Sequence, residues 1–286
     1  MAILGSIGSK LYLAAGAGSL YVFTTHTFTN AGVTGSTGPN LSQVRSAYSS
    51  TSWASTYLNM DVNGIQLWTV PATGVYSFDV RGAQGGQSTN WGPLGGLGAR
   101  MTGRFTLTRG QVLKILVGQK GGDNTYDGGG GGGSFVTTAT NTPLIIAGGG
   151  GGGSASGFSG SGTFGGGTGP NGSSTSWASG GTNGNGGGGS TAGGGGGLIG
   201  NGGGSWGGQS FVNGGVGGSN AFGGFGGGGG GGGTNGAGGG GGYSGGAYAP
   251  WSYYGAGGGS YNDGTSPSNT AEFQSGMGQV IVTRIS

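Results

Sequence analysis

The chain has 286 residues, of which 88 are glycine and only 5 % are charged, with a formal net charge of +3 and no cysteine. The lack of cysteine excludes a disulfide framework and a thiolate metal site, and the scattered Lys and Arg residues form no basic stripe for nucleic acid. Low charge combined with 10 % aromatic residues does not fit a self-repelling disordered coil, and no run of about 18 apolar residues is present to cross a membrane.

Residues 1–25 form an apolar, glycine-spaced leader, which we interpret as an N-terminal attachment segment. It resembles a signal peptide only loosely, because it has no basic start and because glycine, serine and Lys10 interrupt its apolar core. The apolar patches at 11–15 and 20–25 are candidate short strands. Such a leader is expected in a protein released by cell lysis, for example a virion component.

Residues 26–147 have ordinary complexity and, together with 274–286, predict a β-sandwich. Apolar and polar residues alternate in YSFDVRG (76–82), and two further strands in 100–121 meet at Arg109 and Gly110. Short strands separated by turn signals are typical of an antiparallel sandwich. The remaining expected elements are a strand in IQLWTVPATG (65–74) ended by Pro71, one or two helical turns without a strong cap in 41–59, a strand or hairpin in 135–147 and a closing strand in 277–286.

Residues 128–262 contain no charged residue, and nearly half of them are glycine. We place 148–273 in a separate glycine-rich unit, to which the glycine run 128–133 also belongs. Because ordinary sandwich strands precede and follow this insert, its two ends are expected to lie close together. Glycine has no side chain to bury and loses much backbone entropy on ordering, so the backbone itself must be the packing material if this unit is folded.

A bundle of polyglycine II helices fits this requirement. The helix has three residues per turn, rises about 3.1 Å per residue and makes no internal hydrogen bonds, so each N–H and C=O can bond to a neighbouring helix. An enclosed helix needs glycine at all three positions, whereas an edge helix tolerates Ser, Thr, Asn or Ala facing outward. We therefore expect 128–259 to form a hydrogen-bonded lattice with loops between the runs.

Five blocks in the first half resemble the glycine-rich domain of anaplastic lymphoma kinase and leukocyte tyrosine kinase. They are TFTNAGVTGSTGPNLSQVRSAY (27–48), GIQLWTVPATGVYSFDVRGAQGG (64–86), GQVLKILVGQKG (110–121), GGGGGG (128–133) and PLIIAGGGGGG (143–153). The resemblance covers about 23–153 and the C-terminal strand. It implies a jelly-roll-like antiparallel sandwich with a large inserted bundle of polyglycine II helices, hence an all-β fold. The cytokine-contacting segments of those receptors have no match here, so no contact residue is carried over.

The overall design also looks like the tip adhesins of phage long tail fibres, which are cysteine-free chains with a short Met-Ala-aliphatic-Gly start and glycine runs separated by aromatic loops. The start here is MAILGSIG. This likeness rests on design and not on aligned blocks.

The aromatic loops of the insert are the strongest functional signal. Tyr and Trp provide a large rigid contact area and a polar tip, and paratopes mix them with Ser, Gly and Asn. These rings could equally cap the ends of the glycine helices and shield the lattice from water. The phenylalanines Phe158, Phe164, Phe222 and Phe225 favour that capping role. The candidate ligand-binding residues are Trp177, Trp206, Tyr243, Tyr248, Trp251, Tyr253 and Tyr254.

Other site classes find little support in the sequence. His26 lies at an expected strand edge without a nearby acid pair, so we expect no catalytic residue and no enzyme activity. Asp123 and Asp127 in GGDNTYDGG lack an EF-hand spacing, and a solvated turn is favoured over a Ca²⁺ site. No GK[ST] phosphate loop is present, and no cofactor is expected.

The sequence therefore predicts a receptor-binding adhesin of a bacteriophage tail or tail fibre. Its expected partners are a host surface protein or glycan and, through 1–25, a tail or fibre protein. The expected location is the virion, with no nucleic acid and no membrane insertion. The alternatives are an extracellular module of a cellular surface protein that binds a cytokine-like ligand, or a structural glycine-rich protein.

Overall fold

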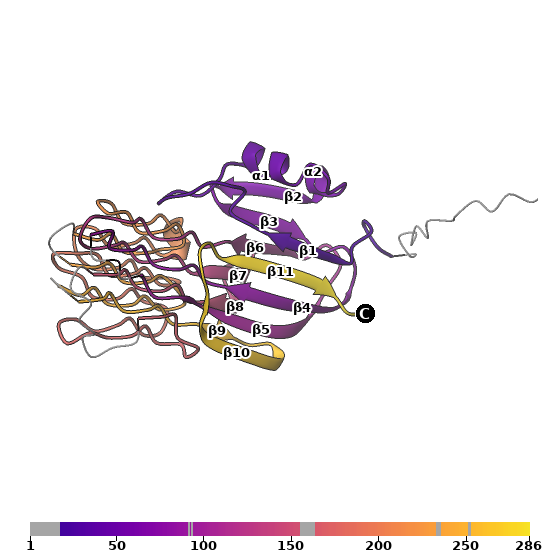
Figure 1. The fold of residues 1–286 in the computed structure, drawn as a ribbon. Helices are drawn as coiled ribbons and strands as arrows, with labels where there is room; N and C mark the ends of the chain where they lie inside the picture. The colour runs from indigo at the N-terminus through magenta and orange to yellow at the C-terminus, as the bar shows by residue number, and fades with distance from the viewer. Residues whose placement is uncertain (1–17, 91, 93, 155–163, 233–235, 251–252) are drawn as a thin grey trace, which may run out of the picture.

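The computed structural model describes residues 18–90, 92, 94–154, 164–232, 236–250 and 253–286 (Figure 1). Two antiparallel sheets pack against each other, which confirms the expected all-β sandwich. The five-stranded sheet has the order β1 (Thr25–Phe28), β11 (Gln279–Arg284), β4 (Gly74–Arg81), β5 (Gly98–Leu107) and β10 (Thr265–Gln274). The six-stranded sheet has the order β2 (Leu58–Val62), β3 (Ile65–Thr69), β6 (Val112–Leu116), β7 (Ser134–Thr138), β8 (Pro143–Ala147) and β9 (Tyr261–Asn262).

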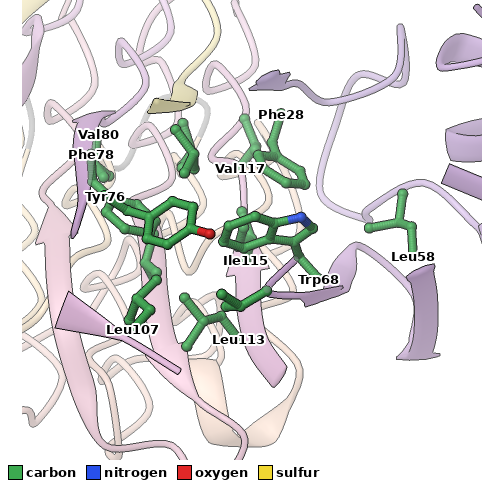
Figure 2. Close-up of a cluster of buried hydrophobic side chains, with 14 of the residues drawn as sticks. Phe28, Leu58, Trp68, Tyr76, Phe78, Val80, Leu107, Leu113, Ile115 and Val117 are labelled. Atoms are coloured by element: carbon green, nitrogen blue, oxygen red, sulfur yellow. The ribbon is translucent and has the colours of Figure 1, made fainter. Parts of the chain in front are cut away.

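The sandwich core follows from the period-two pattern of its strands. On β4, Tyr76, Phe78 and Val80 are fully buried, whereas the residues between them face outward. They meet Trp68 and Ile115 of the opposite sheet, as Figure 2 shows. Because successive side chains of a strand point to opposite faces, the alternation seen in the sequence is sufficient to place this core.

The start of the sandwich differs from the sequence prediction. The strand expected at 20–25 is wrong, since β1 begins only at Thr25. Tyr21 and Phe23 are instead buried in the core, and Tyr21 stacks on Tyr57 with 4.6 Å between ring centroids. Aromatic packing therefore fixes these residues without strand pairing, and part of the expected attachment segment belongs to the sandwich. The patch at 11–15 lies outside the described residues.

The helical segment is better capped than the sequence suggested. Helix α1 (Leu41–Ala47) is followed by the short helix α2 (Ala54–Tyr57). Asn40 accepts a hydrogen bond from the Gln43 N–H at 2.9 Å, and the Gln43 side chain accepts one from the Asn40 N–H at 2.8 Å. This is a capping box, so the expectation of no strong cap is wrong.

Strands β2, β9 and β10 were not expected. Strand β10 is an edge strand whose first nine residues are exposed, and it contains Pro267 and two register irregularities. It therefore lacks the alternation that marks β4. Strand β9 pairs Tyr261 with Ile146 of β8, so the chain returns to the sandwich at 261 and not at 274. This pairing confirms that the two ends of the insert lie close together.

The glycine-rich segments form one body beside the sandwich. We call residues 82–97, 117–133 and 148–260, as far as they are described, the glycine body. It extends from one end of the sheets (Figure 1). Two of these segments, 82–86 and 117–122, directly continue β4 and β6, and the sequence analysis had placed them in the sandwich.

The run 148–153 shows how the body is packed. The N–H groups of Gly149 to Gly153 bond to three neighbouring segments, and the carbonyl groups of the run bond to three others. The six neighbours are 83–86, 96–99, 128–131, 164, 238–241 and 255–258. The lateral hydrogen bonding expected from the composition is therefore present, and the donors and acceptors of the buried backbone pair with one another.

The direction of these bonds repeats every three residues. Gly149 donates to the Gly241 carbonyl at 2.8 Å. Gly152, three residues further, donates to Gly238 of the same neighbouring segment, also at 2.8 Å. The run 128–133 shows the same period of three residues, because its successive N–H groups donate to three neighbouring segments in turn. A repeat of three is the number of residues per turn of a polyproline II-type helix.

This packing leaves no room for side chains. A Cβ atom built on any of Gly148 to Gly152 would come closer than 3.0 Å to a carbonyl oxygen of a neighbouring segment. Real Cβ atoms essentially never approach so closely. The unbroken glycine runs are therefore a packing requirement where segments are enclosed on all sides.

A small apolar cluster joins the body to the sandwich. Phe135 of β7 stacks on Phe211, with 5.0 Å between ring centroids, and Tyr243 stacks on Tyr261 at 4.9 Å. Phe211 belongs to the 3₁₀ turn η1 (Phe211–Asn213). The other members of the cluster are Ile65, Leu116, Ile146, Leu198 and Phe225. Burial of these side chains removes apolar area from water and fixes the body on the outer face of the six-stranded sheet.

Candidate binding surface at the free end of the glycine body

The molecule has two distinct ends. The N–H of Arg284 donates to Thr24 at 2.8 Å, and Leu20 donates to Pro71 at 2.8 Å, so residues 18–25 and the C-terminus lie together. Figure 1 shows them at the end of the sandwich opposite the glycine body. Any ligand held by the body is therefore far from residues 18–25.

The free end of the body can be located from the runs themselves. Gly133 directly precedes β7 and Gly148 directly follows β8, so Gly128 and Gly153 lie farthest from the sheets. These two glycines bond to each other at 2.8 Å, and Gly238 donates to Gly128. We call this level, with the turns beyond it, the free end.

Trp177 and Tyr253 meet at the free end, because Gly255, two residues after Tyr253, donates to the Gly152 carbonyl at 3.0 Å. Their ring centroids are 4.3 Å apart, with the ring planes tilted by 44°. Trp177 is 43 % exposed and Tyr253 is half-buried. The Thr175 hydroxyl donates to the Tyr248 carbonyl at 2.9 Å and thereby ties the Trp177 turn to the Tyr253 segment. The two predicted residues form one aromatic surface although they are far apart in the sequence.

Tyr254, the next residue, has a different partner. Its ring lies 4.5 Å from that of Phe164, and burial raises the pKa of its hydroxyl. Phe164 was expected to cap a glycine helix, but it also helps to line an open groove with Tyr254. The aromatic surface therefore includes a phenylalanine that the sequence analysis had assigned to capping.

The remaining predicted residues do not share one place. Tyr243 lies at the junction with the sandwich, and Tyr248 is only 8 % exposed. Tyr243 is half-buried and Tyr248 is buried, so neither joins the Trp177–Tyr253 pair, and their role in ligand binding stays a prediction. Trp206 is half-buried, and its carbonyl accepts from Gly230 at 2.8 Å near the free end. Trp251 lies outside the described residues.

Of the phenylalanines expected to shield the body, Phe158 lies outside the described residues, and the others differ from one another. Phe225 is 1 % exposed and packs at the junction, which agrees with a shielding role. Phe222 is 51 % exposed. It lies close to Gly122, where a Cβ atom would come closer than 3.0 Å to its ring.

The aspartates of GGDNTYDGG have unequal surroundings. Asp123 accepts from Lys120 at 2.5 Å and from the Gln87 N–H at 2.7 Å, and it is partly exposed. Asp127 is only 2 % exposed, so the expectation of a solvated turn is wrong for this residue. The Ser154 hydroxyl and the Gly236 N–H donate to its carboxylate at 2.8 and 3.0 Å, and these hydrogen bonds offset the cost of burying it.

A charged cluster lies on the outer face of the five-stranded sheet. Arg81 and Arg100 each donate two hydrogen bonds to the Asp79 carboxylate, at 2.9–3.1 Å. Burial alone would raise the Asp79 pKa, but the hydrogen bonds and charges of both arginines outweigh burial and hold that pKa below its ordinary value. Both guanidinium groups lie over the ring of Phe273, so the cluster ties the edge strand β10 to the sheet.

Within the described residues, no group of three or more His, Asp and Glu side chains could hold a metal ion. The helices of that part of the chain are all too short or too polar to cross a membrane.

No protein-family model matches the chain. Part of it is similar to the leukocyte tyrosine kinase receptor of Mus musculus, with 36 % identity over 97 residues. This stretch is 34 % of the chain but only 11 % of the receptor. The predicted resemblance to that receptor is confirmed over this stretch, whereas the likeness to phage tip adhesins stays a prediction.

Proposed function

We propose that this protein is a receptor-binding adhesin of a bacteriophage tail or tail fibre. The single observation that carries the proposal is that the two features lie at opposite ends of the molecule. Residues 18–25 lie at one end, and the Trp177–Tyr253 pair lies at the other. The segment 1–25 would attach the protein to a tail or fibre protein. The free end would contact a bacterial surface protein or glycan when the virion meets its host.

The glycine runs are, in this proposal, polyglycine II helices. The hydrogen-bond directions that repeat every three residues along 128–133 and 148–153 support this conformation. Vibrational circular dichroism provides a test, because a left-handed threefold helix and a β-strand differ in their amide I signals. A spectrum explained by β-strand and coil alone would contradict the assignment.

A rigid lattice suits receptor binding. Each side chain that is already ordered before binding avoids an entropy cost of about 0.5–1.5 kcal/mol. Backbone hydrogen bonds hold both segments of the Trp177–Tyr253 pair in place, as for Tyr248, which donates to Gly188 at 3.0 Å. The body thus presents aromatic rings without an apolar core of its own. Neither a cofactor nor an enzymatic step is part of the proposal.

The double variant Trp177→Ala/Tyr253→Ala tests this function. Removal of two central aromatic contacts of about 2 kcal/mol or more in total should weaken binding at least about thirtyfold. Binding of labelled protein to a panel of bacterial strains, followed by flow cytometry, measures the effect. The melting temperature should change no more than it does for ordinary surface substitutions, because Trp177 is well exposed and Tyr253 is half-buried.

Ile285→Ala is the matched control, because Ile285 is 50 % exposed and lies at the opposite end of the molecule. It should bind like the parent protein. Full retention of cell binding by the double variant would remove the Trp177–Tyr253 pair from the site. Equal loss in both variants would indicate a non-specific effect of lost apolar surface.

A second candidate is an extracellular module of a cellular surface protein that binds a cytokine-like ligand. The similarity to the leukocyte tyrosine kinase receptor favours it. The two candidates differ in their genes and their targets. Neighbouring tail-fibre or lysis genes and binding to intact bacteria support the adhesin, whereas binding to a secreted protein and to none of the bacterial strains supports the module.

A further inference from the structure

We propose that the groove beside the Phe164–Tyr254 pair binds a lysine or arginine side chain of a protein receptor. The inference rests on the proposed function and deepens it, because it selects a protein over a glycan as the ligand at this place. The groove has a volume of about 410 Å³. It is lined by Leu94, Gly95, Gly96, Leu97, Phe164, Gly165, Tyr254 and Glu272.

The walls of the groove are held by the lattice and by the edge of the sandwich. Gly96 donates to Gly151 at 2.9 Å, and Gly166 donates to the Leu97 carbonyl at 2.8 Å. The Glu272 N–H on β10 donates to the Gly166 carbonyl at 3.3 Å. Backbone contacts thus link both sides of the groove, and its shape does not depend on flexible side chains alone.

Its lining combines apolar side chains, polar backbone groups and one negative charge. Leu94 is 63 % exposed and offers an apolar side chain to a ligand in the groove. Glu272 is exposed and is the only charged residue in the lining. Within the described residues, no Lys, Arg or His nitrogen lies within 4.0 Å of its carboxylate.

The backbone at Glu272 supports a specific role for this position. Its φ is 52°, a conformation that residues other than glycine rarely adopt. It lies in the second register irregularity of β10, between Thr270 and Gln274. A β-bulge re-aims a side chain, and strained positions of this kind cluster at functional sites. Here the irregularity lies at the residue that lines the groove.

A basic side chain of a protein satisfies all of these features. Its methylene stem can pack against Leu94 and Leu97 while its charged head stays near water. The rings of Phe164 and Tyr254 offer a face to the cation, and Glu272 supplies the opposite charge. A neutral sugar could stack on the rings and donate hydroxyl groups to Glu272, but it carries no charge opposite to the carboxylate. The charge of the groove therefore favours a basic protein side chain.

Titration of the isotope-labelled protein with n-pentylammonium, followed by NMR, tests the groove directly. The amides of Gly95, Gly96 and Gly165 should shift, and neutral 1-pentanol should bind more weakly. Glu272→Gln keeps the size of the side chain but removes its charge. It should weaken pentylammonium binding about two- to fivefold, as for a solvent-exposed ion pair, and the difference should shrink at high salt.

Asp263→Asn is the control, since it removes the same charge beyond the other end of β10. It should leave pentylammonium binding unchanged. An equal effect of both variants, equal binding of pentanol, or shifts away from the groove would overturn the proposal. Concentration-dependent self-association that Glu272→Gln abolishes would also overturn it, because a second copy would then be the occupant.

The same variants separate this inference from the proposed function. In the cell-binding assay, Glu272→Gln should reduce binding by a similar factor if bacterial adhesion is correct. If the protein binds no bacterium but pentylammonium binds as expected, the adhesin is contradicted and the groove is retained. If cells bind and pentylammonium does not, the groove is contradicted and the adhesin is retained.

Discussion

At the scale of single residues, His26 shows how surroundings decide a role that the sequence leaves open. Its ring packs edge-on against Phe28, Tyr48 and Trp53, with centroid distances of 4.7, 4.6 and 4.9 Å. Its Nε2 atom is buried without a hydrogen-bond partner. Burial lowers the His26 pKa from 6.5 to about 4, because the charged form is poorly solvated there. The half-buried imidazole is therefore neutral and packs among aromatic rings.

The surroundings of His26 predict that the folded protein loses stability in acid. Above pH 6.5, His26 is neutral in both the folded and the unfolded chain, and its full contribution to stability is present. Between pH 6.5 and 4 the unfolded chain takes up the proton first, so stability is lost by up to about 2–3 kcal/mol. His26→Phe and His26→Leu should lose less stability over this range in urea unfolding at several pH values. A pH profile identical to that of the parent in both variants would contradict the low pKa.

The residues of the proposed binding surface were only partly predictable. Trp177 and Tyr253 could be found because a large aromatic in a Ser- and Gly-rich loop has few structural uses. Tyr243 looked equivalent, yet it packs against Tyr261, and no local pattern distinguishes the two cases. Glu272 was missed because it lies on an edge strand far from the aromatic loops in the sequence. Its contact with Gly166 is long-range, and one sequence does not show it.

At the scale of elements, the glycine runs replace side-chain packing by backbone contact. In the run 148–153, a methyl group at Gly151 would overlap the carbonyl oxygen of Gly255. Gly169 provides a contrast in the same body, because a Cβ atom there would meet nothing within 4 Å and its φ is not in the left-handed region. The two positions differ in enclosure, not in residue type.

Alanine substitutions at these two positions should therefore differ. Gly151→Ala must displace backbone and should lower the free energy of unfolding by about 1–3 kcal/mol. Gly169→Ala should be neutral or stabilise by up to about 1 kcal/mol, because it restricts the unfolded chain. Chemical denaturation of the two variants gives the comparison. Equal stability would mean that the run 148–153 is not enclosed as described.

The strands that could be predicted are those with one buried face. Val80 and Val282 alternate with polar or outward residues on β4 and β11, and both strands were expected. Strand β10 could not be predicted, because both of its faces are exposed and its sequence therefore does not alternate between apolar and polar residues. The capping box of α1 was overlooked although Asn40 and Gln43 have the required spacing. Its signal was weak because Gln43 replaces the more familiar Glu.

At the scale of the whole molecule, the two parts use different physics. The sandwich is held by buried side chains such as Trp68 and Tyr76, whereas the glycine body is held by lateral backbone hydrogen bonds between runs far apart in sequence. The composition predicted this division, and the upstream blocks predicted the sandwich. The sequence could not show which runs are neighbours, since identical glycines carry no pairing information.

The central claim is that the glycine body is an ordered lattice that presents fixed loops, and amide hydrogen exchange tests it most directly. We expect the amides of the runs 148–153 and 193–197 to exchange at least about a hundred times more slowly than those of an unstructured chain. The amides of β4 in the same sample provide the reference for a folded sandwich. Random-coil exchange rates in both runs, with β4 protected, would contradict the account.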